Sequence, residues 1–210
     1  MRKGGIGTDR RSISPGKSLS EPRRRFLQAA LAAGITLGFS QTARSDDDKP
    51  GADERPQPGD HFVHAEGDLE GKPVALADIK RDDAPLQVWP VDPATKTVRD
   101  GSRLNQVLLL RLDPASLDED TAAHAADGIV AFSAICSHAG CPVTGWVTGD
   151  SGKQVLKCFC HNSEYDPRQN AAVVFGPAPR KLAALPLKIA DGTLTVAGPF
   201  IGKVVPSQQG

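Results

Sequence analysis

The sequence predicts an all-β domain built as a small antiparallel sandwich or barrel. Gly and Pro are frequent, with 21 and 17 residues in a chain of 210, which is typical of many turns between short segments. Several short apolar runs are bounded by turn residues, and no long run with helical periodicity stands out. The roughly 150 residues that follow residue 60 suffice to bury a core without stabilising cross-links.

The expected strands are short apolar segments between turn residues, and they follow one another along the chain. Four of them share this pattern: 84–92, 105–113, 128–135 and 153–159. Residues 182–200 predict two further strands joined at Asp191-Gly192, which is a strong hairpin signal. Residues 118–127 suit a short helical turn or a loop.

The first 45 residues have the layout of a bacterial export signal. A basic cluster at 23–25 precedes an apolar run over 26–39, and small and acidic residues follow. The stretch RRRFL (23–27) resembles the twin-arginine signal, which implies export of a protein already folded around its cofactor; an ordinary secretory signal is the alternative. Because the run is shorter than the about 20 residues that span a bilayer, we expect cleavage after Ser45, with retention as an inner-membrane anchor as the alternative.

The expected organisation has three parts. Residues 46–60 are charged and rich in Pro and Gly, which predicts a flexible linker between the signal segment (1–45) and one folded domain (61–205). Within that domain, residues 61–127 carry no recognisable motif and are expected to complete the β-scaffold. The formal net charge is zero, so a nucleic acid is not expected as a partner.

All four cysteines lie in two short boxes, CSHAGC (136–141) and CFCH (158–161), and each box also contains a histidine. Both boxes follow predicted strands, so we expect them in loops, where rigid scaffolds usually hold metal sites. Three explanations are open. Two disulfides suit an exported protein but leave His138 and His161 unexplained. A structural zinc usually has about two to four residues between paired ligands, a wider spacing than the CFC stretch offers.

The third explanation is a mixed Cys/His iron–sulfur site, and it is favoured because it also uses the histidines. Cys136 and His138 are two residues apart and can point the same way from an extended loop. Cys158 and His161 are three apart, the span of one tight turn. Two thiolates suit one iron of a [2Fe–2S] cluster, and two imidazoles suit the other.

The two boxes resemble those of the Rieske iron–sulfur protein family. The first box of that family is Cys-x-His-x-x-Cys and the second is Cys-x-Cys-His, so six residues agree in type and spacing within a similar region of about residues 128–200. The resemblance implies one [2Fe–2S] cluster with the ligands Cys136, His138, Cys158 and His161, and a disulfide between Cys141 and Cys160.

The resemblance also implies a tuning role for Ser163 and Tyr165. In cytochrome bc-type complexes, residues at these positions donate hydrogen bonds to a bridging sulfide and to a ligand cysteine sulfur, which raises the reduction potential. We therefore expect a potential of about +150 to +300 mV; the alternative is that both residues cap a turn. The stretch GPAP (176–179) resembles the proline-rich loop that covers the cluster in the same complexes, with an ordinary stiff turn as the alternative.

Further features bear on the class of Rieske protein. Because of the length and the few remaining histidines, we do not expect an oxygenase catalytic domain. Ala139 stands where quinol-oxidising members have a bulky leucine, which puts direct quinol oxidation in doubt. The stretch GCPV (140–143) and the leader are similar to the small subunit of arsenite oxidase, although that subunit typically lacks the Ser and Tyr pair. The segment 148–153 is longer than usual and is expected to be an exposed hairpin tip, with a partner contact as the alternative.

The resulting prediction is an exported, periplasmic Rieske protein that carries single electrons from a quinol- or molybdenum-enzyme donor to a c-type cytochrome. We expect an electron-transfer protein or a subunit of an oxidoreductase complex rather than a stand-alone catalyst. The first alternative is the small Rieske subunit of a molybdenum oxidase such as arsenite oxidase. The second is a non-redox exported binding module that is stabilised by disulfides or zinc.

Overall fold

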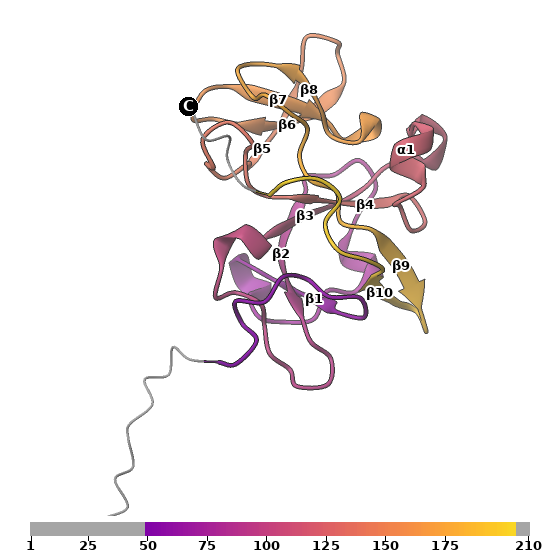
Figure 1. The fold of residues 1–210 in the computed structure, drawn as a ribbon. Coiled ribbons are helices and arrows are strands. Elements are labelled where there is room, and N and C mark those ends of the chain that lie inside the picture. Colours follow the sequence, from indigo (N-terminus) through magenta and orange to yellow (C-terminus); the bar gives the residue numbers. More distant parts are fainter. Residues whose placement is uncertain (1–48, 205–210) are drawn as a thin grey trace, which may run out of the picture. The chain divides into compact units, whose positions relative to one another are not determined.

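Short antiparallel strands build residues 49–204, the part of the chain that the computed structural model describes (Figure 1). They form two four-stranded sheets and a separate two-stranded hairpin. The prediction of an all-β fold is therefore confirmed. The predicted export signal over 1–45 lies outside the described residues. Within 49–204, no helix combines the length and apolar character needed to cross a membrane.

The first sheet has the strand order β1-β2-β3-β4, and every neighbouring pair is antiparallel. Its strands are β1 (His61–His64), β2 (Leu86–Val91), β3 (Val107–Arg111) and β4 (Ile129–Ser133). β3 and β4 pair along their whole length, from Val107 opposite Ser133 to Arg111 opposite Ile129. These elements confirm the strands predicted within 84–92, 105–113 and 128–135.

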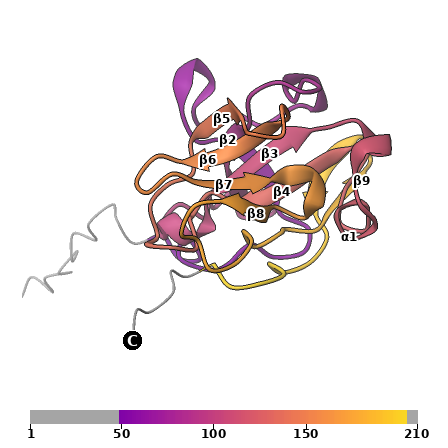
Figure 2. The same cartoon turned by 90° about the horizontal axis from the view of Figure 1, so that it is seen from above.

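The second sheet has the order β5-β6-β7-β8 and is also antiparallel throughout. Its strands are β5 (Gly145–Thr148), β6 (Gln154–Cys158), β7 (Ser163–Asp166) and β8 (Ala172–Phe175). Figures 1 and 2 together show this sheet as a layer over the β2–β4 part of the first sheet. The predicted strand in 153–159 and the predicted hairpin tip at 148–153 are both confirmed.

The predicted hairpin in 182–200 consists of β9 (Leu187–Ala190) and β10 (Thr193–Val196). Its turn residues Asp191 and Gly192 have φ values of 50° and 75°, as a two-residue turn of the primed type requires. The predicted helical turn in 118–127 is α1 (Glu119–Ala122). Short 3-10 helices complete the fold: η1 (Gly67–Leu69), η2 (Leu76–Asp78), η3 (Arg103–Asn105), η4 (Pro114–Ser116) and η5 (Pro167–Gln169).

The strands β3 and β4 are buried on both faces, which explains their uninterrupted apolar sequences. Leu108 packs with Leu156 and Tyr165 in the core between the two large sheets. Its neighbour Leu109 points the other way and packs with Leu194 of the β9–β10 hairpin. Because β3 and β4 are packed on both faces, they form a rigid support. The loop that carries the first cysteine box follows β4 directly.

The structure differs from the flexible linker predicted over 46–60, because residues 49–60 pack onto the domain. Ala52 and Asp60 are buried. Asp60 accepts two hydrogen bonds from the guanidinium of Arg99, from Nε at 2.5 Å and from Nη2 at 3.0 Å, and Glu54 accepts a third from Nη1 at 3.0 Å. A charged segment can pack onto a domain when its charged groups form ion pairs with buried residues. Residues 49–60 do so through Asp60 and Arg99, which are 39 positions apart.

Candidate metal centre

The first box is a compact loop that its own backbone closes. The Cys136 N–H donates to the Cys141 carbonyl at 2.8 Å, and the Gly140 N–H donates to the Cys136 carbonyl at 3.0 Å. Arg103 of η3 fastens the loop from outside, with its Nη1 donating to the Gly140 carbonyl at 2.6 Å. This contact joins residues 37 positions apart, so no local sequence pattern predicts it.

The second box occupies the turn between β6 and β7. Cys158 is the last residue of β6 and pairs with Ser163, the first residue of β7. The backbone N–H groups of Cys160 and His161 in this turn are directed at the Cys158 sulfur. Burial raises the pKa of the Cys158 thiol, while the two N–H groups oppose that rise because they stabilise a thiolate.

The structure brings the four predicted ligands together. Cys136 and Cys158 are free, buried thiols and lie close enough to interact with each other. The His138 and His161 rings meet edge to face, with their centroids 4.6 Å apart. His161 is exposed, whereas His138 is half-buried. Two thiols therefore lie on the inner side of the site and two imidazoles on the outer side.

The disulfide predicted between Cys141 and Cys160 is present in the structure. It links the two boxes covalently, one end in each loop. The Cys158 sulfur lies with these two sulfurs in a cluster less than 4.8 Å across, which resembles a metal-binding group. Because the disulfide consumes two of the three thiols, that cluster does not offer the thiolates that a structural zinc needs.

The donor set fits a [2Fe–2S] cluster of the Rieske type. The Nδ1 atom of His138 is buried and has no hydrogen-bond partner among residues 49–204. A buried polar atom left unpaired costs on the order of 1–3 kcal/mol, and a bound iron would satisfy it. Two thiols and two imidazoles that converge from facing loops are the chemistry that such a cluster requires.

Tyr165 lies directly against one of the predicted ligands. Its hydroxyl is 3.1 Å from the Cys136 sulfur, and the whole residue is buried. Burial raises the pKa of Tyr165, so the hydroxyl keeps its proton and can donate it to the sulfur. The Ser163 hydroxyl accepts a hydrogen bond from the Ala178 N–H at 3.2 Å, which leaves its own proton for another acceptor.

The loop 176–180 contacts the first box and the residues that directly follow the second box. Gly176 has a φ of 86°, and a Cβ atom placed there would lie 2.6 Å from the Ser163 Cα and 2.7 Å from the Asn162 carbonyl. At the other end of the loop, the Ser137 hydroxyl donates to the Arg180 carbonyl at 2.5 Å. The GPAP stretch therefore lies against the residues that directly follow the second box, and Arg180, which comes next, is tied to the first box.

We expect Gly176→Ala to destabilise this region strongly. The added methyl group must displace the backbone of Asn162 and Ser163, and the positive φ adds a further cost of about 1 kcal/mol. The total expected loss in the free energy of unfolding is roughly 3 kcal/mol, measured by urea denaturation. Gly192→Ala is the matched control, because Gly192 has a φ of 75° but nothing within 4 Å of the added atom. Equal losses for the two variants would contradict the proposed contact.

Comparison with known proteins identifies the family. A family model described as the Rieske [2Fe-2S] domain matches residues 79–186, which include both boxes, the disulfide and the loop 176–180. The chain belongs to the Rieske family. Its cofactor is accordingly a Rieske [2Fe–2S] cluster, and the zinc explanation is set aside.

Named relatives share only part of their length with this Rieske chain. The Rieske iron–sulfur subunit of the cytochrome bc1 complex of Mycobacterium tuberculosis is 34% identical over 109 residues, which is 49% of this chain but 25% of that subunit. A putative respiratory nitrate reductase subunit Rieske of Haloferax mediterranei is 41% identical over 80 residues, 38% of this chain and 34% of that protein. The chain therefore covers about a quarter to a third of these relatives.

Two solved structures have a low similarity to this chain. The soluble domain of Rieske protein II of Sulfolobus acidocaldarius has 23% identity and a TM-score of 0.36, and the match covers 49% of this chain and 67% of that one. The ferredoxin of carbazole 1,9a-dioxygenase of Nocardioides aromaticivorans IC177 has 21% identity and a TM-score of 0.38, over 60% of this chain and 93% of that one.

Proposed function

We propose that this Rieske electron-transfer protein works in the periplasm, where it takes single electrons from a quinol- or molybdenum-enzyme donor and passes them to a c-type cytochrome. The ligands would be Cys136 and Cys158 on one iron and His138 and His161 on the other. The cluster supplies the one-electron chemistry, and the chain orients it and tunes its potential. The observation that supports the proposal most is the convergence of two buried thiols and two outer imidazoles. One of these imidazoles, that of His161, is exposed and offers an electron a short path to a partner protein.

The identity of the donor is the open part of the proposal, and two sets of observations bear on it. The similarity to bc1 Rieske subunits supports a place in a quinol-oxidising chain. Ala139, however, is exposed and small at a position where a bulky leucine is expected for direct contact with quinol. We therefore propose that another subunit or enzyme oxidises the quinol and that this protein relays the electron.

A second candidate function is that of a Rieske subunit in a larger oxidoreductase, such as a molybdenum oxidase of the arsenite oxidase kind. The likeness to a putative respiratory nitrate reductase subunit supports it. Purification of the native protein separates the two candidates. Co-purification with a large molybdenum subunit would favour the second, whereas a carrier free of such a subunit that reduces a c-type cytochrome would favour the first.

Export is tested separately. Replacing Arg23 and Arg24 by lysine should leave the protein in the cytoplasmic fraction, because the twin-arginine route reads that pair. Fractionation followed by immunoblotting measures the outcome, and Arg10→Lys/Arg11→Lys serves as a control with the same change outside the RRRFL stretch. Normal periplasmic recovery of the Arg23/Arg24 variant would contradict the proposed route.

Tyr165→Phe should lower the midpoint potential of the cluster. The variant loses the hydroxyl that lies 3.1 Å from the Cys136 sulfur, and such a bond is stronger to the reduced, more negative cluster. If the free energy of this hydrogen bond differs by about 1 kcal/mol between the oxidised and reduced cluster, the potential changes by roughly 40 mV for a one-electron couple. A redox titration checks this value, and Ser116→Ala, which removes a hydroxyl in η4, should leave the potential unchanged. An unchanged potential in Tyr165→Phe would show that the bond does not tune the cluster.

A further inference from the structure

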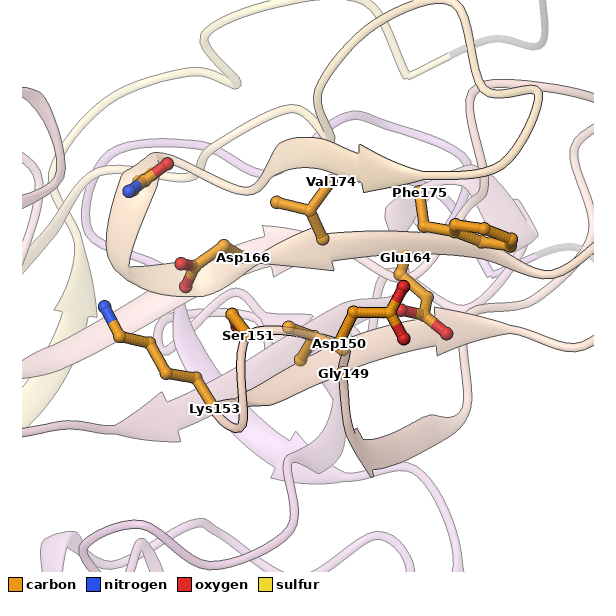
Figure 3. A pocket seen from close by; sticks show the side chains of 10 residues that line it. Gly149, Asp150, Ser151, Lys153, Glu164, Asp166, Val174 and Phe175 are labelled. Carbon is orange, nitrogen blue, oxygen red and sulfur yellow. The ribbon is translucent and has the colours of Figure 1, made fainter.

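A groove of about 330 Å³ lies on the outer face of the second sheet, the face that is turned away from the core (Figure 3). One wall is the tip of the β5–β6 hairpin, from Gly149 to Lys153. The other wall is the end of β8, where Val174 and Phe175 are 50% and 52% exposed. The floor is β7. This volume is at the low end of the range for ligand-binding pockets and suits one long side chain.

Three carboxylates line this groove. Glu164 and Asp166 come from β7 and are buried, with side-chain exposures of 11% and 7%. Asp150 comes from the exposed hairpin tip. Figure 3 shows Glu164 towards the Phe175 end of the groove and Asp166 towards the Lys153 end. Acidic groups thus sit beside an apolar wall.

The cationic side chains next to Glu164 and Asp166 occupy only one oxygen of each carboxylate, so the other oxygen can still accept a hydrogen bond. Lys157 binds one oxygen of Glu164 at 2.8 Å, and Arg168 approaches one oxygen of Asp166, with its N–H at 3.0 Å and its guanidinium at 3.7 Å. Within 49–204, the second oxygen of Glu164 and of Asp166 has no hydrogen-bond partner, and Asp150 and Lys153 form no ion pair. These unpaired oxygens are not among the fully buried ones, so they stay accessible from the groove, where they favour a hydrogen-bond donor and a cationic one most of all.

The geometry points to a docking surface: the groove takes an arginine or lysine side chain of the protein that exchanges electrons with the cluster. The apolar stem of such a side chain would lie along Val174 and Phe175, and its cationic end would meet the carboxylates of Asp150, Glu164 and Asp166. This inference rests on the proposed function, because it assigns the occupant to the redox partner.

The position of the groove fits that role. Glu164 follows Ser163, which is paired with the predicted ligand Cys158. Phe175 precedes Gly176, which lies against Asn162 and Ser163, the two residues that follow the second box. A partner anchored in the groove would therefore be held beside the box whose histidine is exposed, and Phe159, 60% exposed within that box, would extend the apolar contact.

The test is the rate at which the reduced, cluster-loaded protein reduces a lysine-rich c-type cytochrome, followed by stopped flow at low and high ionic strength. Asp150→Asn should slow the second-order rate roughly threefold at low ionic strength and Asp150→Lys roughly tenfold, with both differences shrinking in high salt. Asp150 is exposed, so neither variant is expected to disturb folding. Asp191→Asn is the matched control, because it removes the same charge at the β9–β10 turn; its rate should stay close to that of the wild type.

Equal rates for Asp150→Asn and Asp191→Asn would overturn the groove as a docking site while leaving electron transfer intact. Failure of the wild type itself to reduce the cytochrome would overturn the proposed function and, with it, this inference. If millimolar calcium at constant ionic strength slows the wild type but not Asp150→Asn, the groove is a metal site, and the inference is equally overturned.

Discussion

Replacing His161 by alanine is expected to yield a folded protein without a Rieske cluster. His161 is exposed, so its removal costs little packing, but it is one of the two predicted imidazole ligands. A cluster left with three of its four protein ligands should be lost or held in a species with altered spectra. Iron and acid-labile sulfide analysis, together with electron paramagnetic resonance of the reduced protein, gives the result.

The control for that variant is His61→Ala, which removes a half-buried histidine at the start of β1, outside both boxes. It should keep its full iron content and an unchanged resonance signal. If His161→Ala also keeps both, His161 is not a ligand, and the assignment of the second box must be revised.

The second large effect is expected from Asp60→Asn. Asp60 and Arg99 form a buried ion pair with side-chain exposures of 3% and 5%, and hydrogen bonding to Asp60 raises the pKa of Arg99. Removing the carboxylate charge leaves the guanidinium buried without its main partner, which costs about 3–5 kcal/mol in the free energy of unfolding. Urea denaturation measures the loss.

Glu54→Gln is the matched control, because Glu54 binds the same guanidinium but its side chain is 64% exposed. The loss there should stay below about 1 kcal/mol, as is usual for exposed ion pairs. Similar losses for the two variants, or a loss below 1 kcal/mol for Asp60→Asn, would mean that residues 49–60 add little to the stability of the domain.

The strands that could be predicted from the sequence are those whose buried residues are apolar. The run VLLLR of β3 is the clearest case, because both of its faces are covered. β7 was not predicted, because its sequence, SEYD, is mostly polar. All four of its residues are nevertheless buried. Its polar side chains are satisfied by partners from other elements, such as Lys157 for Glu164 and the Ala178 N–H for Ser163. Such pairing depends on the completed fold and leaves no local pattern.

The centre was more predictable than the scaffold around it. Metal ligands have to match in type and spacing, so CSHAGC and CFCH indicated both the cluster and the disulfide. The contacts that hold the boxes in place were not visible in the same way. Arg103 reaches Gly140 from η3, and Ser137 reaches Arg180 across 43 positions, and nothing in the local sequence marks either contact.

A redox titration of the purified protein, followed by electron paramagnetic resonance of the reduced form, tests directly whether this chain is a high-potential electron carrier. We expect a Rieske-type [2Fe–2S] signal with a midpoint potential above about +150 mV, because Tyr165 is placed to donate to the Cys136 sulfur. A Rieske signal at a clearly lower potential would contradict the tuning role of Ser163 and Tyr165. The absence of any iron–sulfur signal in protein prepared with ample iron would contradict the claim that this chain is an electron carrier.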